Sequence, residues 1–232
     1  AELHAGSAFS FLRGASLPEE LAACAAGLGI PAVALLDRDG VYGAPRFHQA
    51  AKKAGLRAHI GAEVTATDGR VYPLLVETRA GYQNLCRLIT RMKLRAPKGE
   101  GAATPEEIAE HAAGLICLAG EPDRAWLAWL GGAFGRGNVY VELQRHLQRG
   151  EEARNQALLE LACSLKLPLV ATNGVSYATP AGREILDVFT AIREKVTLAE
   201  AGRRLARNAE RHLKPPAEMA RLFADLPEAI AR

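Results

Sequence analysis

Strand-like and helix-like segments alternate along most of this chain, and that alternation restricts its fold more than any other feature. Short apolar runs, typical of buried strands, are each followed by a longer segment with helical character. After a first strand ending at Leu3-His4, we expect strands at 32–37, 57–64, 71–76, 115–119, 139–143 and 169–172. We expect helices at about 17–29, 44–55, 80–92, 105–112, 123–134 and 151–165, and another beginning at Thr179-Pro180. Six or seven such βα units predict a mainly parallel sheet, closed or open, with functional residues at the carboxyl ends of its strands.

Local signals mark the ends of several elements. Ser16 and Glu19 have the spacing of a capping box, which predicts a helix that begins there and ends near Gly29. Asp68-Gly69 is a strong hairpin signal between two strand-like runs. After about Thr197 the strand-like runs stop. We therefore predict a barrel-type domain over residues 1–197 and a polar helical extension over 198–232 that leads toward a further part of a larger protein.

The composition is that of an ordinary globular protein. The 232 residues suit one large α/β domain, and 29 − 26 gives a net charge of only +3, too small to imply nucleic-acid binding by itself. No apolar run approaches the roughly 18–20 residues of a membrane span, and no signal peptide is visible, so we expect a cytoplasmic protein without a membrane partner. The chain opens without Met, directly on a strand, which suggests that the natural protein begins earlier or that this is an excised piece.

The four cysteines give no sign of a metal site or a disulfide framework. None belongs to a C-x-x-C pair, and each lies among apolar residues: Cys24, Cys86, Cys117 and Cys163. We expect buried free thiols in a reducing compartment.

Three residues with metal-ligating side chains stand at successive strand ends. His4, Asp37 and Glu63 would meet on one rim of an α/β barrel, an arrangement that suits divalent cations. Arg13 and Arg38 stand between them, and an arginine cannot coordinate a metal because it has no lone pair to give. The sequence therefore indicates a metal-type rim whose chemistry has changed.

Several blocks in the right order resemble the PHP (polymerase and histidinol phosphatase) domain of bacterial C-family DNA polymerases. Two of them look like the error-prone, translesion branch of that family, namely Arg154–Ala157 and Ala217–Phe223. The wider resemblance is carried by 4–63, 82–89, 140–146 and 171–175. It implies a distorted (β/α)7, TIM-like barrel. It also implies that active relatives hold a cluster of metal ions and hydrolyse phosphate esters or remove 3′-terminal nucleotides.

Carried over residue by residue, the family's ligand pattern is mostly missing. The opening H-x-H becomes His4-Ala5-Gly6, the D-H pair becomes Asp37-Arg38, and the closing D-x-H becomes Gly174-Val175-Ser176. Arg13 stands where a ligand precedes Gly14, a histidine position falls near Val71, and a cysteine or histidine position falls near Glu121. The resemblance thus implies a vestigial rim without catalytic residues, formed by His4, Gly6, Arg13, Asp37, Arg38, Glu63, Glu121, Gly174 and Ser176. Any residual metal would fall to His4, Asp37 and Glu63. We expect Arg13 or Arg38 to form a salt bridge with Asp37 or Glu63.

The sequence is compatible with three functions. The first is a structural and interaction module of an error-prone DNA polymerase with no cofactor of its own, Mg²⁺ serving the parent enzyme. Its partners would be the remainder of the polymerase chain, DNA through the parent enzyme, and other mutagenesis or replication proteins. The second is an active phosphoesterase or 3′–5′ exonuclease with Zn²⁺ or Mn²⁺. The third is a DNA-binding module without chemistry, for which the candidate contacts are Arg91, Lys93, Arg95, Arg203, Arg204 and Arg207. His146 is a further candidate polar residue of the site.

Overall fold

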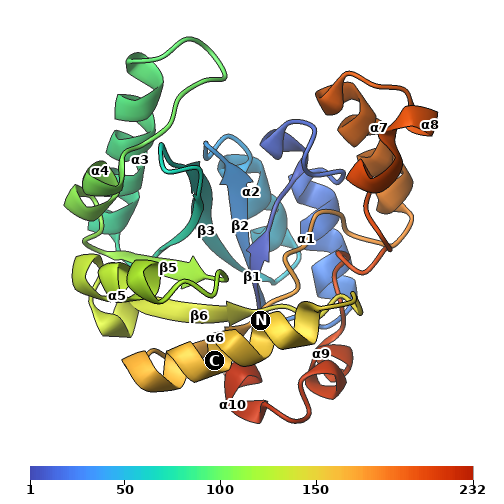
Figure 1. The fold of residues 1–232 in the computed structure, drawn as a ribbon. Helices are drawn as coiled ribbons and strands as arrows, with labels where there is room; N and C mark the ends of the chain where they lie inside the picture. The colour runs from blue at the N-terminus through green and yellow to red at the C-terminus, as the bar shows by residue number, and fades with distance from the viewer. Residues whose placement is uncertain (232) are drawn as a thin grey trace.

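The computed structural model describes residues 1–231, and its centre is a curled sheet of seven strands (Figure 1). The strands lie in chain order across the sheet. They are β1 (Glu2–Ala5), β2 (Ala32–Arg38), β3 (Arg57–Thr65), β4 (Val71–Val76), β5 (Leu115–Ala119), β6 (Val139–Leu143) and β7 (Leu169–Ala171).

Helices surround this sheet, with α3 and α4 on one side and α7 and α8 on the other (Figure 1). The α-helices are α1 (Pro18–Gly27), α2 (Ala44–Lys53), α3 (Arg79–Leu94), α4 (Pro105–Glu110), α5 (Arg124–Ala133), α6 (Glu151–Leu165), α7 (Gly182–Glu194), α8 (Leu198–Ala201), α9 (Pro216–Leu222) and α10 (Pro227–Ile230). Three short 3₁₀ segments are η1 (Ala8–Ser10), η2 (Arg136–Asn138) and η3 (Gly202–Arg204). No helix within residues 1–231 has both the length and the apolar character that crossing a bilayer requires.

The predicted distorted α/β barrel is confirmed, with one irregular strand. β4 runs antiparallel to both β3 and β5, whereas the other pairs are parallel. The antiparallel β3–β4 pair follows from the Asp68-Gly69 hairpin, where Gly69 adopts a φ of 83°. At the other end, Gly6 N donates to the carbonyl of Val175 at 2.8 Å and Val175 N donates to the carbonyl of His4 at 2.8 Å. These bonds tie the end of β1 to the segment after β7, so the first and last strand ends lie together.

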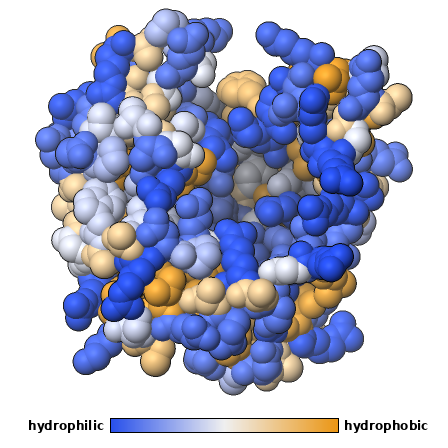
Figure 2. Space-filling view, in the orientation of Figure 1, coloured by the Kyte–Doolittle hydropathy of each residue, from blue (hydrophilic) through white to orange (hydrophobic). Residues whose placement is uncertain are grey.

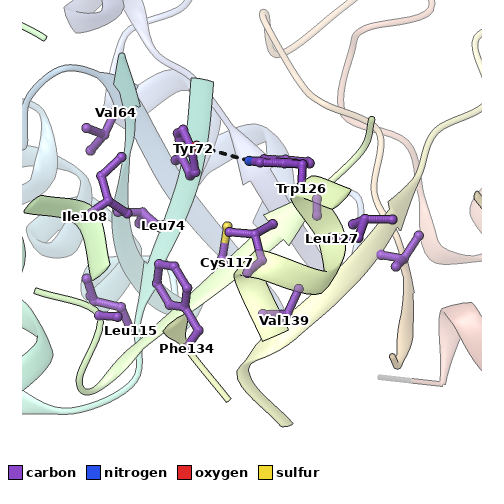
Figure 3. Close-up of a cluster of buried hydrophobic side chains, with 14 of the residues drawn as sticks. Val64, Tyr72, Leu74, Ile108, Leu115, Cys117, Trp126, Leu127, Phe134 and Val139 are labelled. Carbon is purple, nitrogen blue, oxygen red and sulfur yellow. Dashed lines mark hydrogen bonds between the residues drawn. The ribbon is translucent and has the colours of Figure 1, made fainter. Parts of the chain in front are cut away.

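The main core fills the space between the sheet and α3, α5 and α6. Tyr72 of β4 is fully buried against Trp126 of α5, with ring centroids 5.6 Å apart, and the Trp126 indole N–H donates to the Tyr72 hydroxyl at 3.1 Å (Figure 3). The buried N–H and hydroxyl are therefore both satisfied. A second core packs α1 and α2 against β2 through Leu21, Leu35 and Phe47.

The start of α1 differs from the capping box predicted from sequence. The helix begins at Pro18, and the backbone N–H of Leu17 donates to Glu20 Oε2 at 2.8 Å. The Ser16 hydroxyl instead accepts a hydrogen bond from the backbone N–H of Ala178 at 2.9 Å. Ser16 therefore fastens the first loop to the segment after β7, a long-range contact that outweighs its local capping preference.

Residues 198–231 are less helical than predicted. Residues 205–215 are largely irregular and run along the strand ends, where Ser176 N donates to the carbonyl of Arg211 at 2.9 Å. Met219, Phe223 and Ala229 are buried in the main core. This segment has too few apolar residues to fold alone, and it buries those it has against the barrel.

The cysteines form no disulfide in the described part of the chain. Cys117 is buried as expected, and burial raises the pKa of its thiol. The expectation of burial is wrong for Cys163, which is exposed on α6.

Candidate functional site

A polar cavity of about 450 Å³ lies at the carboxyl ends of β1, β3 and β6 and beside the segment after β7. Its wall contains His4, Glu63 and Glu142 from these strands and Gly174 and Ser176 from the segment. The parallel arrangement brings these positions together because strand ends that point the same way meet on one rim. This cavity corresponds to the rim that the sequence predicted.

His4 lies between two carboxylates in this cavity. Its Nδ1 is 2.7 Å from Glu142 Oε1, and its Nε2 is 2.9 Å from Glu63 Oε1. A neutral imidazole has one donor and one acceptor nitrogen, whereas two carboxylates both need a donor. The geometry therefore requires His4 to be an imidazolium ion, with both ring nitrogens protonated.

The charges around His4 shift the pKa values in the direction that this geometry demands. Burial alone would lower the pKa of His4, but the charges and hydrogen bonds of Glu142 and Glu63 raise it well above its ordinary value. Burial alone would raise the pKa of Glu63, but His4 and Arg38 lower it to about 2. The cluster is a fixed set of alternating charges at neutral pH.

Arg38 completes the cluster on the side of Glu63. Its Nε donates to Glu63 Oε2 at 2.9 Å, and each of the two side chains is 22% exposed. This salt bridge is one of those predicted from the sequence, and its geometry confirms that pairing. Glu63 thus has one oxygen on His4 and the other on Arg38.

Asp37 does not take part in the cluster, because the predicted arginine salt bridge forms with Glu63 and not with Asp37. Its Oδ1 accepts from the backbone N–H of Ser7 at 2.7 Å and from the Ser10 hydroxyl at 2.7 Å. The Ser7 hydroxyl also contacts both of its oxygens at 2.9 Å. Burial raises the pKa of Asp37, and these hydrogen bonds act against that rise. Asp37 therefore fixes the loop after β1, and its oxygens are taken up by serines.

Of the other predicted rim positions, four line the cavity and Glu121 does not. Gly6, Arg13, Gly174 and Ser176 line the cavity. Glu121 does not, because its carboxylate is half exposed and lies 3.5 Å from Arg70 Nε. At Gly174 the backbone φ is 55°, and a side chain would meet the amide of Gln144 at 2.6 Å.

Sequence reasoning missed the residues that complete the site from β6, β7 and the first residue of β1. The Thr172 hydroxyl donates to Glu142 Oε1 at 2.5 Å, and Gln144 Nε2 donates to the same oxygen at 3.1 Å. Glu2 accepts from the backbone N–H groups of His4 and Asn173 at 2.9 and 2.8 Å. Glu142 had a readable signal, since an acidic residue near the end of an apolar strand is the pattern that identified Asp37.

His146 lies at the cavity wall but is occupied by its neighbours. It is 2% exposed, with Nδ1 at 3.1 Å from Glu151 Oε1 and Nε2 at 2.8 Å from the carbonyl oxygen of Asn173. Burial lowers its pKa, and the charge of Arg211 adds to that effect. His146 therefore joins the end of β6 to α6 and to the segment after β7.

Four arginines of the cavity wall have no carboxylate partner. Arg154 and Arg211 donate to the backbone carbonyls of Gly120 and Gly174, respectively. None of the four forms an ion pair within residues 1–231; they are Arg13, Arg149, Arg154 and Arg211. The carboxylates of the cavity are meanwhile held by histidines and Arg38, so the uncompensated charge of the wall is positive.

Within residues 1–231 some of the candidate nucleic-acid contacts are held in salt bridges, whereas others are free to bind phosphate. Arg91 pairs with Glu107 and Glu110, and Arg95 pairs with Glu107, so both arginines hold α3 against α4. Lys93 forms no ion pair within residues 1–231 and lies over the Tyr42 ring. The second predicted group is exposed on η3 and the following loop instead of striping one helix: Arg203, Arg204 and Arg207.

These residues do not fit a metal cluster. His4 Nδ1 points at Glu142, and the two oxygens of Glu63 are bonded to His4 Nε2 and Arg38 Nε, so these groups leave no set of free lone pairs that converges on a common point. Among residues 1–231 no three His, Cys, Asp or Glu side chains are grouped so as to hold a metal ion.

We predict that Arg38→Ala lowers the free energy of unfolding by about 1–2 kcal/mol. This is less than the 3–5 kcal/mol typical of a broken buried pair, because the pair is partly wet and His4 continues to hold Glu63. Urea unfolding at neutral pH measures the change. Arg46→Ala is a matched control, since its pair with Glu19 is exposed on both sides and should contribute less than about 1 kcal/mol. A loss for Arg38→Ala no larger than that of the control would contradict a stabilising role.

The fold and the rim together define the class to which the chain belongs. Residues 2–146 match the family model of the PHP domain, and the chain is therefore a member of the PHP-domain family. A candidate metal-dependent phosphoesterase from Bifidobacterium adolescentis shares the fold with a TM-score of 0.54 and 17% identity, covering 75% of this chain and 86% of that one. An amidohydrolase from Chromobacterium violaceum has a TM-score of 0.52 and 15% identity, covering 76% and 87%.

Within that family the similar sequences are error-prone DNA polymerases. The enzyme of Anaeromyxobacter sp. (strain K) is 43% identical over 249 residues, covering 100% of this chain and 22% of the polymerase. The enzyme of Pseudomonas fluorescens is 41% identical over 237 residues, covering 100% of this chain and 23% of the polymerase. The chain thus spans about a fifth of the length of these relatives.

Proposed function

We propose that this chain is the PHP-domain portion of an error-prone DNA polymerase and acts there as a structural and interaction module without hydrolytic activity. Identity of 38–43% over 99–100% of the chain supports the assignment to that group of proteins. In this proposal the salt-bridged cluster of His4, Glu63, Glu142 and Arg38 takes the place of the metal ions.

The observation that carries the proposal is the position of His4 between two carboxylates. An imidazolium ion cannot act as a metal ligand, because both ring nitrogens carry protons. Its positive charge and that of Arg38 balance Glu63 and Glu142, and balancing these carboxylates is part of what a divalent cation does in such a site. A metal would have to displace two hydrogen bonds and the proton of a histidine whose pKa is raised.

The alternative function is a metal-dependent phosphoesterase or 3′–5′ exonuclease that uses Zn²⁺ or Mn²⁺. Such chemistry needs clustered cations to activate water and to clamp the phosphate. The residual donors His4, Asp37 and Glu63 do not converge, since Asp37 is held by Ser7 and Ser10. The donor set therefore favours the first function.

The same proposal covers the protein of which this domain would be a part, its partners and its location. Nucleotidyl transfer with Mg²⁺ would be carried out by other parts of the polymerase, whose remaining chain is the main partner. We also propose DNA and other mutagenesis or replication proteins as partners. The proposed location is the cytoplasm. The division at residue 197 also remains a proposal. The packing of Phe223 and Ala229 against the barrel supports an extension that straps onto the domain.

A second candidate role is contact with a phosphate backbone at the cavity. The four arginines without carboxylate partners favour it, because guanidinium groups bind phosphate oxygens in pairs of hydrogen bonds. Binding to DNA that weakens steeply as salt increases would support this role. Equal binding at low and high salt would count against it.

Metal content tests the main proposal directly. We expect elemental analysis of the mildly purified chain to find well under one tightly bound transition metal per molecule, and no release of phosphate or nucleotide with Mn²⁺ or Zn²⁺ present. Stoichiometric binding of two or three such ions would contradict the proposal.

Restoring the ligands is a further prediction about the same site. A variant that returns five of the family's ligands should bind Zn²⁺ or Mn²⁺ in a titration where the parent chain does not. Activity is a stricter demand, because supporting hydrogen bonds must also orient the ligands. Gln144→Ala has to accompany Gly174→Asp, because the Gln144 amide fills the space that the new side chain needs. The substitutions are Gly6→His, Arg13→Asp, Arg38→His, Gly174→Asp and Ser176→His, together with Gln144→Ala. Position 121 is left unchanged because Glu121 lies outside the cavity.

The parent chain with Gln144→Ala alone is the control, and it should remain metal-free. A folded ligand-restored variant that still binds no metal would show that the strand ends do not converge as described.

A further inference from the structure

Three aromatic side chains cluster next to the cavity, and we call them the aromatic surface: Phe9, Phe11 and Tyr42. Phe9 is half-buried, whereas the other two are exposed. Phe11 is 67% exposed and Tyr42 is 50% exposed, and their ring centroids are 6.3 Å apart. Phe9 lies 6.5 Å from Phe11. Phe9 and Phe11 belong to η1 and its end, whereas Tyr42 lies in the loop after β2. Two large rings from separate loops are thus held side by side in water.

The backbone holds Phe11 outward at some cost. Phe11 and Leu12 have φ angles of 32° and 62°, in the left-handed region that residues with side chains disfavour. The carbonyl of Leu12 accepts a hydrogen bond from Arg193 Nη1 at 2.8 Å, and Phe11 N donates to the carbonyl of Ala8 at 3.2 Å. Tertiary contacts therefore maintain a strained turn that exposes an aromatic ring, a combination that points to a binding role.

Positive charge surrounds the aromatic surface. Lys93 Nζ lies 5.0 Å from the centre of the Tyr42 ring and donates to its hydroxyl at 2.8 Å. Arg13 follows Phe11 by two residues, and burial together with the positive charges of Arg38 and Arg193 lowers the pKa of its guanidinium group. Neither Lys93 nor Arg13 forms an ion pair within residues 1–231. Arg46, over the Phe9 ring at 5.4 Å, is paired with Glu19.

The aromatic surface lies where a ligand could reach it. Figure 1 shows the loop after β1 between α2 and α7, with the α3–α4 side of the molecule opposite. Figure 2 shows a hollow between these two sides, with hydrophilic residues on both of its walls. Arg13 follows Phe11 by two residues in the chain and also lines the cavity. An extended chain could therefore contact the rings and the cavity arginines in succession.

We propose that the aromatic surface binds single-stranded nucleic acid, with one or two unpaired bases stacked on Phe11 and Tyr42 and the adjacent phosphates facing Arg13 and Lys93. Exposed rings flanked by uncompensated cations match the stacking and electrostatic contacts that recognise single strands. A duplex keeps its bases stacked on one another and cannot offer their faces to the rings. An apolar protein partner would leave the charges of Arg13 and Lys93 without counterparts. The inference goes beyond the structural role proposed above and does not depend on the state of His4.

The test is fluorescence anisotropy of the full chain with a labelled oligothymidylate, compared with a duplex of the same length. We expect the single strand to bind more tightly than the duplex. Phe11→Ala and Tyr42→Ala should each weaken binding by about 5- to 150-fold, the range found for loss of one stacked base. The slope of log K against log salt should stay unchanged in these two variants. Arg13→Ala should lower that slope by about 0.7, the amount expected for one phosphate contact of a single strand.

Two control variants separate stacking from other causes. Tyr82→Ala removes a ring that is 41% exposed on α3, away from this surface, and should leave affinity unchanged. Phe11→Trp should retain affinity, whereas Phe11→Leu should lose it, because leucine keeps the apolar surface but has no ring to stack. Circular dichroism confirms that each variant is folded.

The proposal is overturned if single strand and duplex bind equally, or if Phe11→Leu binds as well as the parent chain. Salt-dependent binding that persists in Phe11→Ala and Tyr42→Ala without loss would also overturn it, while leaving phosphate contact by the cavity arginines in place. No binding to either form would overturn both.

Discussion

Replacing His4 with alanine should lower the free energy of unfolding by about 3–5 kcal/mol, the range for breaking a buried ion pair by removal of one partner. Glu142 is 5% exposed and Glu63 is bonded to the other ring nitrogen of His4, so the variant would leave two mostly buried carboxylates without the cation between them. Within residues 1–231 Glu142 has no cation other than His4 to pair with, whereas Glu63 keeps Arg38. Urea unfolding at neutral pH, read by far-ultraviolet circular dichroism, measures the loss.

Two further variants show whether the loss comes from charge. His48→Ala removes an exposed histidine from α2 and should change stability by less than about 0.5 kcal/mol. Adding Glu142→Gln to His4→Ala should recover part of the loss, because it removes one unpaired buried charge. A loss below about 1 kcal/mol for His4→Ala, or no recovery in the double variant, would contradict the ion-paired description of the site.

Stability should also fall as the pH rises from about 5 to 8, through Glu2 and His4. Burial raises the pKa of Glu2 to about 7, even though the backbone N–H groups of Asn173 and His4 act in the opposite direction. The folded chain therefore keeps a proton that the unfolded chain releases above its ordinary pKa of 4.5. Each pKa unit corresponds to about 1.4 kcal/mol, so Glu2 alone should remove about 3 kcal/mol between these two pKa values.

His4 acts in the same direction at higher pH. Its pKa is raised well above 6.5, so its stabilising effect is complete below that value and is lost as the pH rises through the folded pKa. Glu63 acts in the opposite direction at low pH. Its pKa is lowered to about 2, so its contribution is present above 4.5 and is lost as the pH falls toward 2. The greatest stability should therefore lie on the acid side of neutrality.

Denaturant unfolding at pH 5, 7 and 8 measures this dependence. Glu2→Gln should abolish the part of the decline that lies below pH 7, because the amide does not titrate. Glu77→Gln changes an exposed carboxyl and should keep the decline of the parent chain. A parent chain whose stability stays level or rises between pH 5 and 7 would show that Glu2 is ionised throughout that range.

The order of elements was accessible from local sequence because each element has a local cause. Val71–Val76, Leu115–Ala119, Val139–Leu143 and Glu151–Leu165 have the bounds that apolar runs and helix signals predicted. The prediction failed where a long-range contact competes with a local one. Ser16 looks like a helix cap but bonds to Ala178, and residues 205–215 are irregular because they bond along the strand ends instead of forming a helix.

The location of the candidate site was predictable from the sequence, but the hydrogen-bond and salt-bridge partners of its side chains were not. Strand-end positions identified His4, Asp37 and Glu63, because side chains at the ends of parallel strands share a rim, and two of these three, His4 and Glu63, bond to each other in the site. Sequence could not show that Asp37 is held by serines, or that Glu121 turns away toward Arg70. Those outcomes depend on the conformation of loops, which no periodic pattern specifies.

The strands and the hairpin at Asp68-Gly69 could be predicted from the sequence alone, since these depend on residue type and on near neighbours. Only the tertiary structure decided that His4 meets Glu142, 138 residues further along the chain. It also decided that Glu2 is buried against Asn173 and that Phe11 and Tyr42 share one exposed surface. Each of these contacts joins segments that are distant in sequence, and the arrangement of the strands that brings these segments together is a property of the whole fold.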